Sequence, residues 1–300
     1  MSSTGPIGPT ASTGEVLAKA AEVGGVELRG AVLVRDGSHA IYRLADNVIA
    51  RIGQPGSIEH AERELRISQW LNDSGVPTVE AETSLTQPIV IADRPVTWWR
   101  LIPDHRPSTP RELGATLRAL HALPPPNEFA IPSYDPFAGL ERRIVTARLI
   151  DQNDRTWLLE HYVRLRGEYD ALPNIVTPSV IHGDAWQANV VVPPSGIRTV
   201  LDLDKVSLGW REWDLIQLAV DYTDFSRVSD EEYQSFVEAY GGYDVTAWIG
   251  FRVLADIQEL RWVGFAVARA EASRAAASQA KHRIACLRGQ VPPPWRWDAL

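Results

Sequence analysis

Three short apolar runs separated by two polar turns make up the segment of residues 31–53. It reads AVLVRDGSHAIYRLADNVIARIG, in which an Asp-Gly-Ser-His turn and an Ala-Asp-Asn turn separate the runs. This pattern predicts strands over 31–35, 40–44 and 48–52, and turns this short require antiparallel pairing. A helix is predicted to precede them from about residue 15.

The pattern changes to a helical one after Gly53-Gln54-Pro55-Gly56, with Ser57 as the expected N-cap of a helix that runs to Asn72. The apolar side chains of this helix fall on two faces, so we expect its two halves to pack against different partners. Two further strands are predicted on either side of Ala92-Asp93-Arg94.

Helical periodicity dominates from Pro107 onward, and only residues 179–192 and 197–206 resemble strands. These two strands are expected to be neighbours, because a four-residue Pro-Pro-Ser-Gly turn separates them. The order predicts an α+β fold with a small antiparallel sheet lobe followed by a larger, mainly helical lobe. The predicted division is a flexible leader over 1–14, a first lobe over 15–103 and a second over 104–300.

Composition narrows the class of protein. The 45% hydrophobic and 23% charged residues are those of a globular protein with a sizeable core. A single cysteine excludes a disulfide framework and is compatible with a reducing, cytoplasmic location. The net charge of −8 argues against a nucleic-acid partner. No signal peptide or membrane span is expected, since no apolar stretch is long and uncharged enough.

Candidate chemistry is concentrated in VIHGDAWQANVVV, residues 180–192. His182, Asp184 and Asn189 lie here between two apolar runs that read as buried strands. The polar loop is either a structural elbow or a site that rigid strands hold in place. Asp202 follows thirteen residues after Asn189, and Asp214 a further twelve residues on.

This combination of His-Gly-Asp, four residues, Asn, a strand ending in Asp, and then Gly and Asp-Leu resembles the aminoglycoside phosphotransferase and choline kinase family. The resemblance covers most of residues 30–220. It implies a protein-kinase-like fold and transfer of the γ-phosphate of ATP or GTP, with Mg²⁺, to a hydroxyl of a small molecule. Phosphoryl transfer needs an oriented hydroxyl, metal ions that bridge phosphates, and compensation of charge.

The resemblance implies a role for each polar side chain of the motif. Asp184 is expected to accept the proton of the substrate hydroxyl, while Asn189 and Asp202 offer Mg²⁺ the oxygen ligands that it prefers. His182 is expected to support the loop. Asp214 is expected to hold the backbone amides of the loop from the start of a helix, and Asp204 is either a second metal ligand or a solvated carboxylate.

The first lobe is expected to hold the nucleotide. In the resembled fold a basic side chain on the third strand pairs with the phosphates and with a glutamate on the next helix, and Arg51 and Glu64 occupy these positions. Arginine stands where lysine is usual, so the phosphate geometry must differ. Gly37 and Ser38 would bring a turn close to the phosphates, and main-chain groups near Leu101 would contact adenine.

Two properties of the chain bear on the substrate. Eleven tryptophans occur, three of them in or near the motif, and aromatic faces bind ammonium groups. We therefore expect a small polar, cationic substrate such as an aminoglycoside, an amino sugar or a choline-like metabolite. The tryptophans and the carboxylates that could join them are Trp186, Trp210, Trp213, Asp221, Asp224 and Glu259. A non-catalytic nucleotide-binding module and a metal-dependent hydrolase remain alternatives.

Overall fold

The computed structural model describes residues 11–37, 39–173 and 178–300, and their chain divides into two compact units. Unit 1 contains the residues up to Ser108 together with Ala188–Asp204, and unit 2 contains Thr109–Gln187 and Lys205–Leu300. The stretch 188–204 thus falls in unit 1, although it lies within the predicted second lobe. The predicted boundary near Ile102-Pro103-Asp104 stays a prediction.

Unit 1 is built on a five-stranded antiparallel sheet with the strand order β1-β2-β3-β5-β4. The predicted strands of this region are confirmed to within one or two residues at each end. The elements are α1 (Thr13–Gly24), β1 (Val32–Asp36), β2 (Ala40–Arg43), β3 (Val48–Ile52), α2 (Ile58–Asp73), β4 (Ile89–Ile91) and β5 (Arg94–Arg100).

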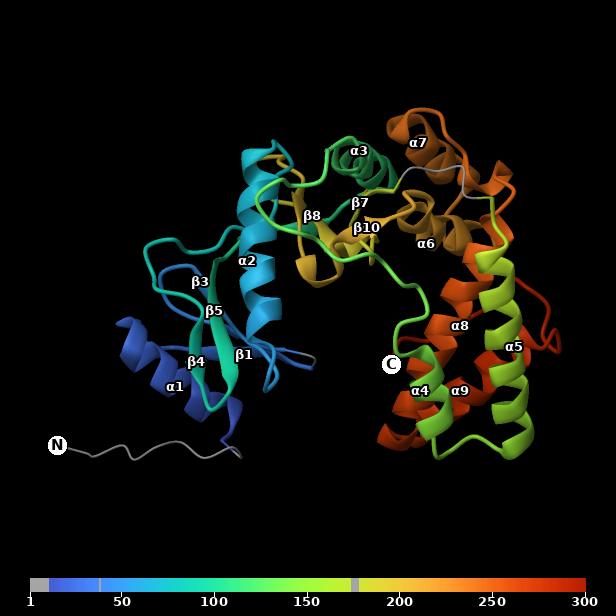
Figure 1. Ribbon diagram of the computed structural model, residues 1–300, viewed down its shortest axis with the longest axis horizontal. Helices are drawn as coiled ribbons and strands as arrows, with labels where there is room; N and C mark the ends of the chain where they lie inside the picture. Colours follow the sequence, from blue (N-terminus) through green and yellow to red (C-terminus); the bar gives the residue numbers. More distant parts are fainter. Residues whose placement is uncertain (1–10, 38, 174–177) are drawn as a thin grey trace. The chain divides into compact units, whose positions relative to one another are not determined.

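Helix α1 covers one face of this sheet (Figure 1). The Ser12 hydroxyl accepts from the Glu15 amide while the Glu15 carboxylate accepts from the Ser12 amide, so a capping box begins the helix. Its apolar side chains pack with Ala50 and Ile52 of β3, both fully buried. Because side chains alternate along a strand, Arg51 points to the opposite face, as predicted.

Helix α2 lies on that opposite face. Ser57 occupies its N-cap position, as predicted, although the Ser57 hydroxyl donates to the Gln54 carbonyl at 2.7 Å and caps no helix amide. The buried positions form a single stripe and not two, and this stripe includes the polar side chains of Glu64 and Ser68. Because two of its residues are polar, this stripe cannot be recognised from the apolar positions alone.

A second, three-stranded sheet in unit 1 contains the strand that follows the motif. Its order is β6-β8-β9, formed by β6 (Arg106–Pro107), β8 (Val190–Val192) and β9 (Thr199–Val200). The pairing of β8 with β9 confirms that these two strands are neighbours. The Thr78 hydroxyl and the Val79 amide both donate to the Val200 carbonyl, at 2.7 and 2.9 Å, which ties this sheet to the rest of the unit.

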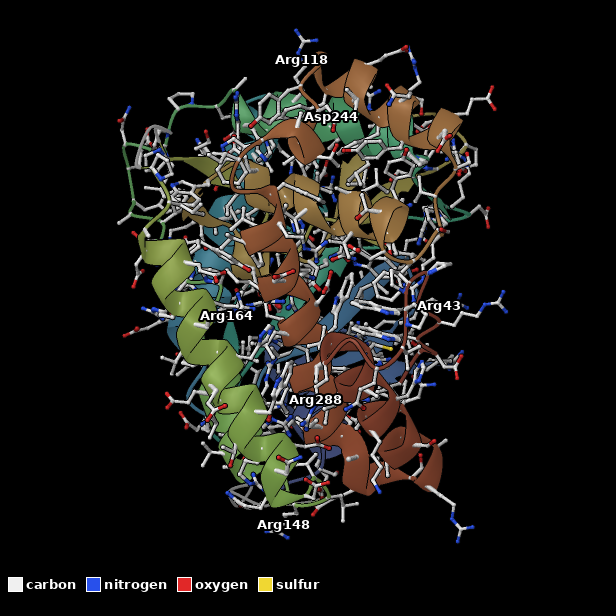
Figure 2. All side chains as sticks on the ribbon, turned by 90° about the vertical axis from the view of Figure 1, so that its right-hand side faces the viewer. Arg43, Arg118, Arg148, Arg164, Asp244 and Arg288 are labelled. Carbon is white, nitrogen blue, oxygen red and sulfur yellow. The ribbon has the colours of Figure 1, made fainter. Side chains whose placement is uncertain are left out.

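Unit 2 is mainly helical. Its helices are α3 (Pro110–His121), α4 (Leu140–Thr146), α5 (Gln152–Asp170), α6 (Glu212–Thr223), α7 (Asp230–Tyr240), α8 (Phe251–Arg269) and α9 (Arg274–Leu287). Helix α5 runs beside α8 (Figure 1 and Figure 2). No helix among the described residues is long and apolar enough to cross a membrane.

A two-stranded sheet in unit 2 pairs β7 (Ser179–Ile181) with β10 (Ser207–Gly209). The two apolar runs within residues 179–192 form separate strands on either side of the polar loop, as predicted. The first half of that stretch pairs with β10 and the second half with β6 and β9. The polar loop between β7 and β8 therefore begins on one sheet and ends on another.

Candidate active site

The Arg51 side chain is the centre of a charged cluster in unit 1. Its Nη1 lies 3.0 Å from Oε1 of Glu64 on α2, and both side chains are nearly buried, at 14% and 3% exposed. Burial raises the pKa of the Glu64 carboxyl to about 7, helped by Asp204 and Asp202, while Arg51 acts in the opposite direction. The structure thus brings together the two residues that the sequence predicts as a pair.

Two other side chains hold the second arm of the guanidinium. Nη2 of Arg51 lies 3.1 Å from Nδ1 of His39 and 3.7 Å from Oδ1 of Asp202. Burial, together with the charge of Arg51, lowers the pKa of His39 to about 4. His39 is therefore neutral near pH 7, and its Nδ1 accepts a hydrogen bond from Arg51. A lysine has no planar fork and could not reach all three partners in this geometry.

A small pocket opens beside this cluster, within unit 1. Besides His39, Arg51 and Glu64 it is lined by Gly53, Ser57, His60, Ala61, Pro95 and Thr97. Gly53 is required by the close approach of its neighbours, because a Cβ there would lie 2.6 Å from Oγ of Ser57 and 2.8 Å from Cγ of Pro95. The pocket gives the Arg51 cluster a polar hollow next to the start of α2.

Asn189 and Asp202 are placed by neighbouring strands of the second sheet in unit 1. The Leu201 amide donates to the Asn189 carbonyl at 2.8 Å, so the residue before Asp202 is bonded directly to Asn189. Asp202 has a φ of 55°, and its side chain is 40% exposed. An amide oxygen and a carboxylate are ligands that suit Mg²⁺, which takes one or two protein carboxylates together with phosphates and waters.

That donor set fits a phosphate-bound cation better than a metal held by protein alone. No group of three or more His, Cys, Asp or Glu among the described residues is arranged to hold a metal ion. Asp204 lies near enough to Glu64 to raise the pKa of that carboxyl, which adds negative charge to the same region.

The remaining nucleotide-site predictions concern the main chain of unit 1. The Gly37 amide donates to the His39 carbonyl at 3.2 Å, which closes a tight turn, and Ser38 lies outside the described residues. The Leu101 amide donates to the Asn47 carbonyl at 2.7 Å. That amide is engaged within the protein, so an adenine contact at Leu101 would involve the carbonyl oxygen.

In unit 2 the polar loop is held through its backbone. Asp214, 1% exposed at the start of α6, accepts from the His182 amide at 2.6 Å and from the Gly183 amide at 2.8 Å. This is the role that the sequence predicts for Asp214. His121 at the end of α3 lies 3.0 Å from the same carboxylate, and Nδ1 of His182 accepts from the Asp184 amide at 3.2 Å.

Two aromatic side chains hold the same loop through the carbonyl of Gly183. The Tyr134 hydroxyl and the Trp213 indole N–H both donate to the Gly183 carbonyl, at 3.0 and 3.2 Å. Gly183 has a φ of 79°, a conformation that glycine adopts without strain. The amides of His182, Gly183 and Asp184 and the carbonyl of Gly183 are thus all hydrogen-bonded within unit 2, and the Asp184 side chain beside them is 34% exposed.

Comparison with known proteins assigns the chain to a family. The model of the phosphotransferase enzyme family, which is named for the aminoglycoside phosphotransferases, matches residues 31–251. The chain belongs to this phosphotransferase family. The match includes Arg51, Glu64, Asp184, Asn189 and Asp202, and the resemblance that the sequence suggests is thereby confirmed.

Solved structures confirm the protein-kinase-like fold. Amicoumacin kinase hAmiN, in complex with AMP-PNP, Ca²⁺ and Ami, has a TM-score of 0.72 at 14% identity, with 95% of this chain and 96% of that chain covered. Choline kinase LicA from Streptococcus pneumoniae has a TM-score of 0.63 at 14% identity, with coverage of 90% and 98%. At such identities the likeness concerns the fold and not the substrate.

A curated relative matches over a shorter stretch. It is a probable ketoamine kinase from Lactiplantibacillus plantarum (strain ATCC BAA-793 / NCIMB 8826 / WCFS1), 34% identical over 82 residues, which is 27% of this chain. The chain spans 28% of the length of that relative in this match. The proteins similar to this chain thus include an amicoumacin kinase, a choline kinase and a probable ketoamine kinase.

The structure gives little support to the acidic residues proposed for substrate binding. Asp221 is paired with Arg227 at 2.8 Å, and Asp224 and Glu259 are both paired with Arg252. These carboxylates are already neutralised by arginines within unit 2. Of the three tryptophans, Trp213 is buried against the loop, whereas Trp186 is 43% exposed within it and remains a candidate for contact with substrate.

The sequence analysis missed several residues that contact the predicted site. His39, His121 and Tyr134 each bond to a site residue or to the loop that carries one. A histidine directly after Gly37-Ser38 was a signal for the first, because it follows the turn predicted to approach phosphates. No local signal identified His121 or Tyr134, since both reach the loop only through the packing of distant segments.

Proposed function

We propose that this phosphotransferase is a small-molecule kinase that transfers the γ-phosphate of ATP or GTP to a hydroxyl group of a small polar substrate. The observation that carries the proposal is the Asp184 carboxylate, held on a loop whose backbone is fixed by the buried Asp214. A protein that only binds nucleotide has no need of a base held in this way. The Arg51–Glu64 pair beside a polar pocket supports binding of the phosphates.

Each side chain has a defined part in the proposed reaction. The substrate hydroxyl oxygen forms a bond to the γ-phosphorus, the bond from that phosphorus to the β-γ bridging oxygen breaks, and the hydroxyl proton passes to the Asp184 carboxylate. Arg51 binds and orients the phosphates. Asn189 and Asp202 would hold Mg²⁺, which when bound compensates the negative charge of the phosphates.

The proposed acceptor is an alcohol on an aminoglycoside, amino sugar or choline-like molecule. The net charge of −8 and the exposed Trp186 favour a cationic substrate. The pairing of Asp224 and Glu259 with Arg252 means that any cation would bind elsewhere in unit 2. A metal-dependent hydrolase leaves Arg51 and Glu64 without a role and is the weaker alternative.

Phosphate transfer from ATP and from GTP to a panel of aminoglycosides, amino sugars and amino alcohols tests the proposal. Asp184→Asn should lower turnover by about 10²–10⁴-fold and leave nucleotide affinity nearly unchanged, because a base acts on the acceptor hydroxyl. Asp202→Ala should instead abolish the Mg²⁺ dependence of nucleotide binding. Asp73→Asn, at an exposed position of α2, is the matched control.

Three results would contradict this assignment. Turnover by Asp184→Asn equal to that of wild type would remove Asp184 from the mechanism. Normal binding of Mg·ATP by Asp202→Ala would show that this carboxylate is not the metal ligand. Absence of transfer to every acceptor, with nucleotide bound in the presence of Mg²⁺, would favour the non-catalytic binding module.

A further inference from the structure

Lys205 lies against the proposed base within unit 2. Its Nζ is 2.7 Å from Oδ2 of Asp184, and the two side chains are 38% and 34% exposed. Lys205 is the last residue of a short 3₁₀ turn, Leu203–Lys205, that directly follows Asp202. The ammonium therefore bonds to the carboxylate that the proposed reaction uses.

The backbone of Lys205 is fixed relative to this loop. A Cβ on Gly183 would lie 2.6 Å from the Lys205 carbonyl oxygen and 3.0 Å from its Cβ, so the two chain segments are in direct contact. The Ser207 hydroxyl donates to the same carbonyl at 2.7 Å, and Ser207 is paired with Ile181 in the β7–β10 sheet. Strand pairing thus places the Cβ of Lys205 against Gly183, the residue before Asp184.

The loop itself supplies no cation to the base. Ala185-Trp186-Gln187-Ala188, which separate Asp184 from Asn189, carry no positive charge. Lysine is also rare in the chain, because Lys19, Lys205 and Lys281 are the only lysines among 30 basic residues. Lysine carries a compact ammonium on a flexible stem, which can lie close to a carboxylate, whereas arginine carries a larger planar fork.

The Lys205–Asp184 ion pair is expected to contribute little to folding stability. Ion pairs at such exposure contribute about 0–1 kcal/mol, because solvent screens them. Its larger effect is expected to be on the orientation of the Asp184 carboxylate. A carboxylate on an exposed loop rotates about its last torsion, and a bond to one oxygen fixes the direction of the other. Displacing a reacting group by about 1 Å can lower a rate by about 10²-fold.

We propose that Lys205 is a positioning residue for phosphoryl transfer, whose ammonium holds one oxygen of Asp184 and directs the carboxylate toward the acceptor hydroxyl. This inference rests on the proposed function of Asp184. Lys205 takes no proton from the acceptor. It acts through the base, so its loss affects the chemical step more than binding of either substrate.

Steady-state kinetics on Lys205→Met, Lys205→Arg and Lys205→Ala test the role, with Lys281→Met on α9 as the matched control. Lys205→Met should lower kcat by about tenfold or more, a part of the ~10²–10⁴-fold effect of a positioned base. The KM for nucleotide should change by less than about twofold. Lys205→Arg should restore part of kcat, and added methylamine or ethylamine should raise the kcat of Lys205→Ala.

The outcomes separate this inference from the proposed function. A kcat of Lys205→Met within about twofold of an active wild type overturns the role of Lys205 and leaves the kinase function in place. So does a loss confined to KM, or a failure of both arginine and amines to restore kcat in variants whose thermal unfolding matches wild type. A wild type that transfers phosphate to no acceptor overturns both proposals. Lys281→Met should match wild type throughout.

Discussion

Two arginine–glutamate clusters of this protein have similar chemistry and different surroundings. In unit 1, Arg51 pairs with Glu64 at 3.0 Å, and in unit 2, Arg252 pairs with Glu259. Each glutamate is 3% exposed, and burial raises the pKa of Glu64 to about 7 and that of Glu259 to about 8. Perturbation of the carboxyl pKa is therefore the same in kind at the two places.

The partners of the two guanidinium groups differ. Arg252 contacts three carboxylates, since Nε lies 2.5 Å from Asp256 and Nη1 lies 2.9 Å from Asp224, in addition to Glu259. Asp256 and Glu259 follow Arg252 on one face of α8, at spacings that bring side chains of a helix together. Figure 2 shows Arg164 on the neighbouring helix α5, and its charge counteracts the effect of burial on the pKa of Asp256.

Arg51 has one close carboxylate, a neutral histidine at 3.1 Å and the more distant Asp202 at 3.7 Å. A polar pocket opens beside it. In the Arg252 cluster one cation is thus shared by three carboxyl groups of unit 2, whereas Arg51 faces a hollow and a proposed metal ligand. The comparison teaches that a shifted pKa marks a buried charge, and that the surroundings decide whether the charge is available to a ligand.

Of the two clusters, the one around Arg51 should have the larger effect on activity when its arginine is removed. Arg51→Ala should lower kcat/KM for nucleotide by about 100-fold, which corresponds to about 2.7 kcal/mol, because the phosphates lose their oriented cation. Unfolding free energy should fall by only about 1 kcal/mol, since Glu64 can take up a proton. Arg51→Lys should recover part of the activity. Steady-state kinetics measure the change in kcat/KM, and urea unfolding measures the change in stability. Unchanged kinetics would mean that the phosphates do not bind at Arg51.

Removing Arg252 should lower the stability of the protein more than its activity. Arg252→Met leaves three carboxylates without their shared cation, so unfolding free energy should fall by about 2 kcal/mol, less than for a fully buried pair because the arginine is 47% exposed. Turnover of the folded protein should stay within about twofold of wild type. Arg274→Met, at an exposed position of α9, is the control. A loss of activity without a loss of stability would give the Arg252 cluster a direct role in the reaction.

A double-mutant cycle sharpens the assignment in unit 1. Glu64→Ala should weaken nucleotide binding less in Arg51→Ala than in wild type, with a coupling of about 1–2 kcal/mol, because directly interacting residues are not additive. Isothermal titration of the four proteins with Mg·ATP gives the coupling. Additive losses would mean that the pair does not act as a unit toward phosphate.

The smallest expected effect concerns two histidines. Burial lowers the pKa of His39 in unit 1 and of His161 in unit 2 to about 4 from an ordinary value near 6.5. The unfolded chain then binds more protons than the folded one between pH 6.5 and 4, so stability falls as the pH decreases through that range. His39→Gln and His161→Gln should each reduce this loss between pH 7 and pH 5 by about 1 kcal/mol.

Nucleotide affinity separates the two histidines. Only His39→Gln should also change nucleotide affinity at pH 7, because only His39 bonds to Arg51. An equal effect of His161→Gln on affinity would contradict the assignment of nucleotide binding to unit 1. Denaturant unfolding at several pH values and binding titrations at pH 7 provide the measurements.

The sequence alone determined the local elements and the motif. Apolar runs separated by short turns over 31–52 predicted three antiparallel strands. Alternation along 48–52 predicted the direction of Arg51, because a strand places successive side chains on opposite faces. The spacing from Asp184 to Asp202 identified the family. The role of Asp214 also followed from the sequence, since an aspartate at the start of a helix is well placed to accept from loop amides.

Only the tertiary structure decided which distant segments meet. Strand β7 pairs with β10 and not with the nearer β8 or β9, which brings Lys205 to Asp184. The single buried stripe of α2 contains Glu64. A buried polar residue interrupts the pattern of apolar positions, so the helical period of the stripe is not visible in the sequence. Hydrophobic periodicity is a property of a short window, whereas strand pairing and buried charge depend on contacts between residues far apart in the chain. These contacts form only when the whole unit packs.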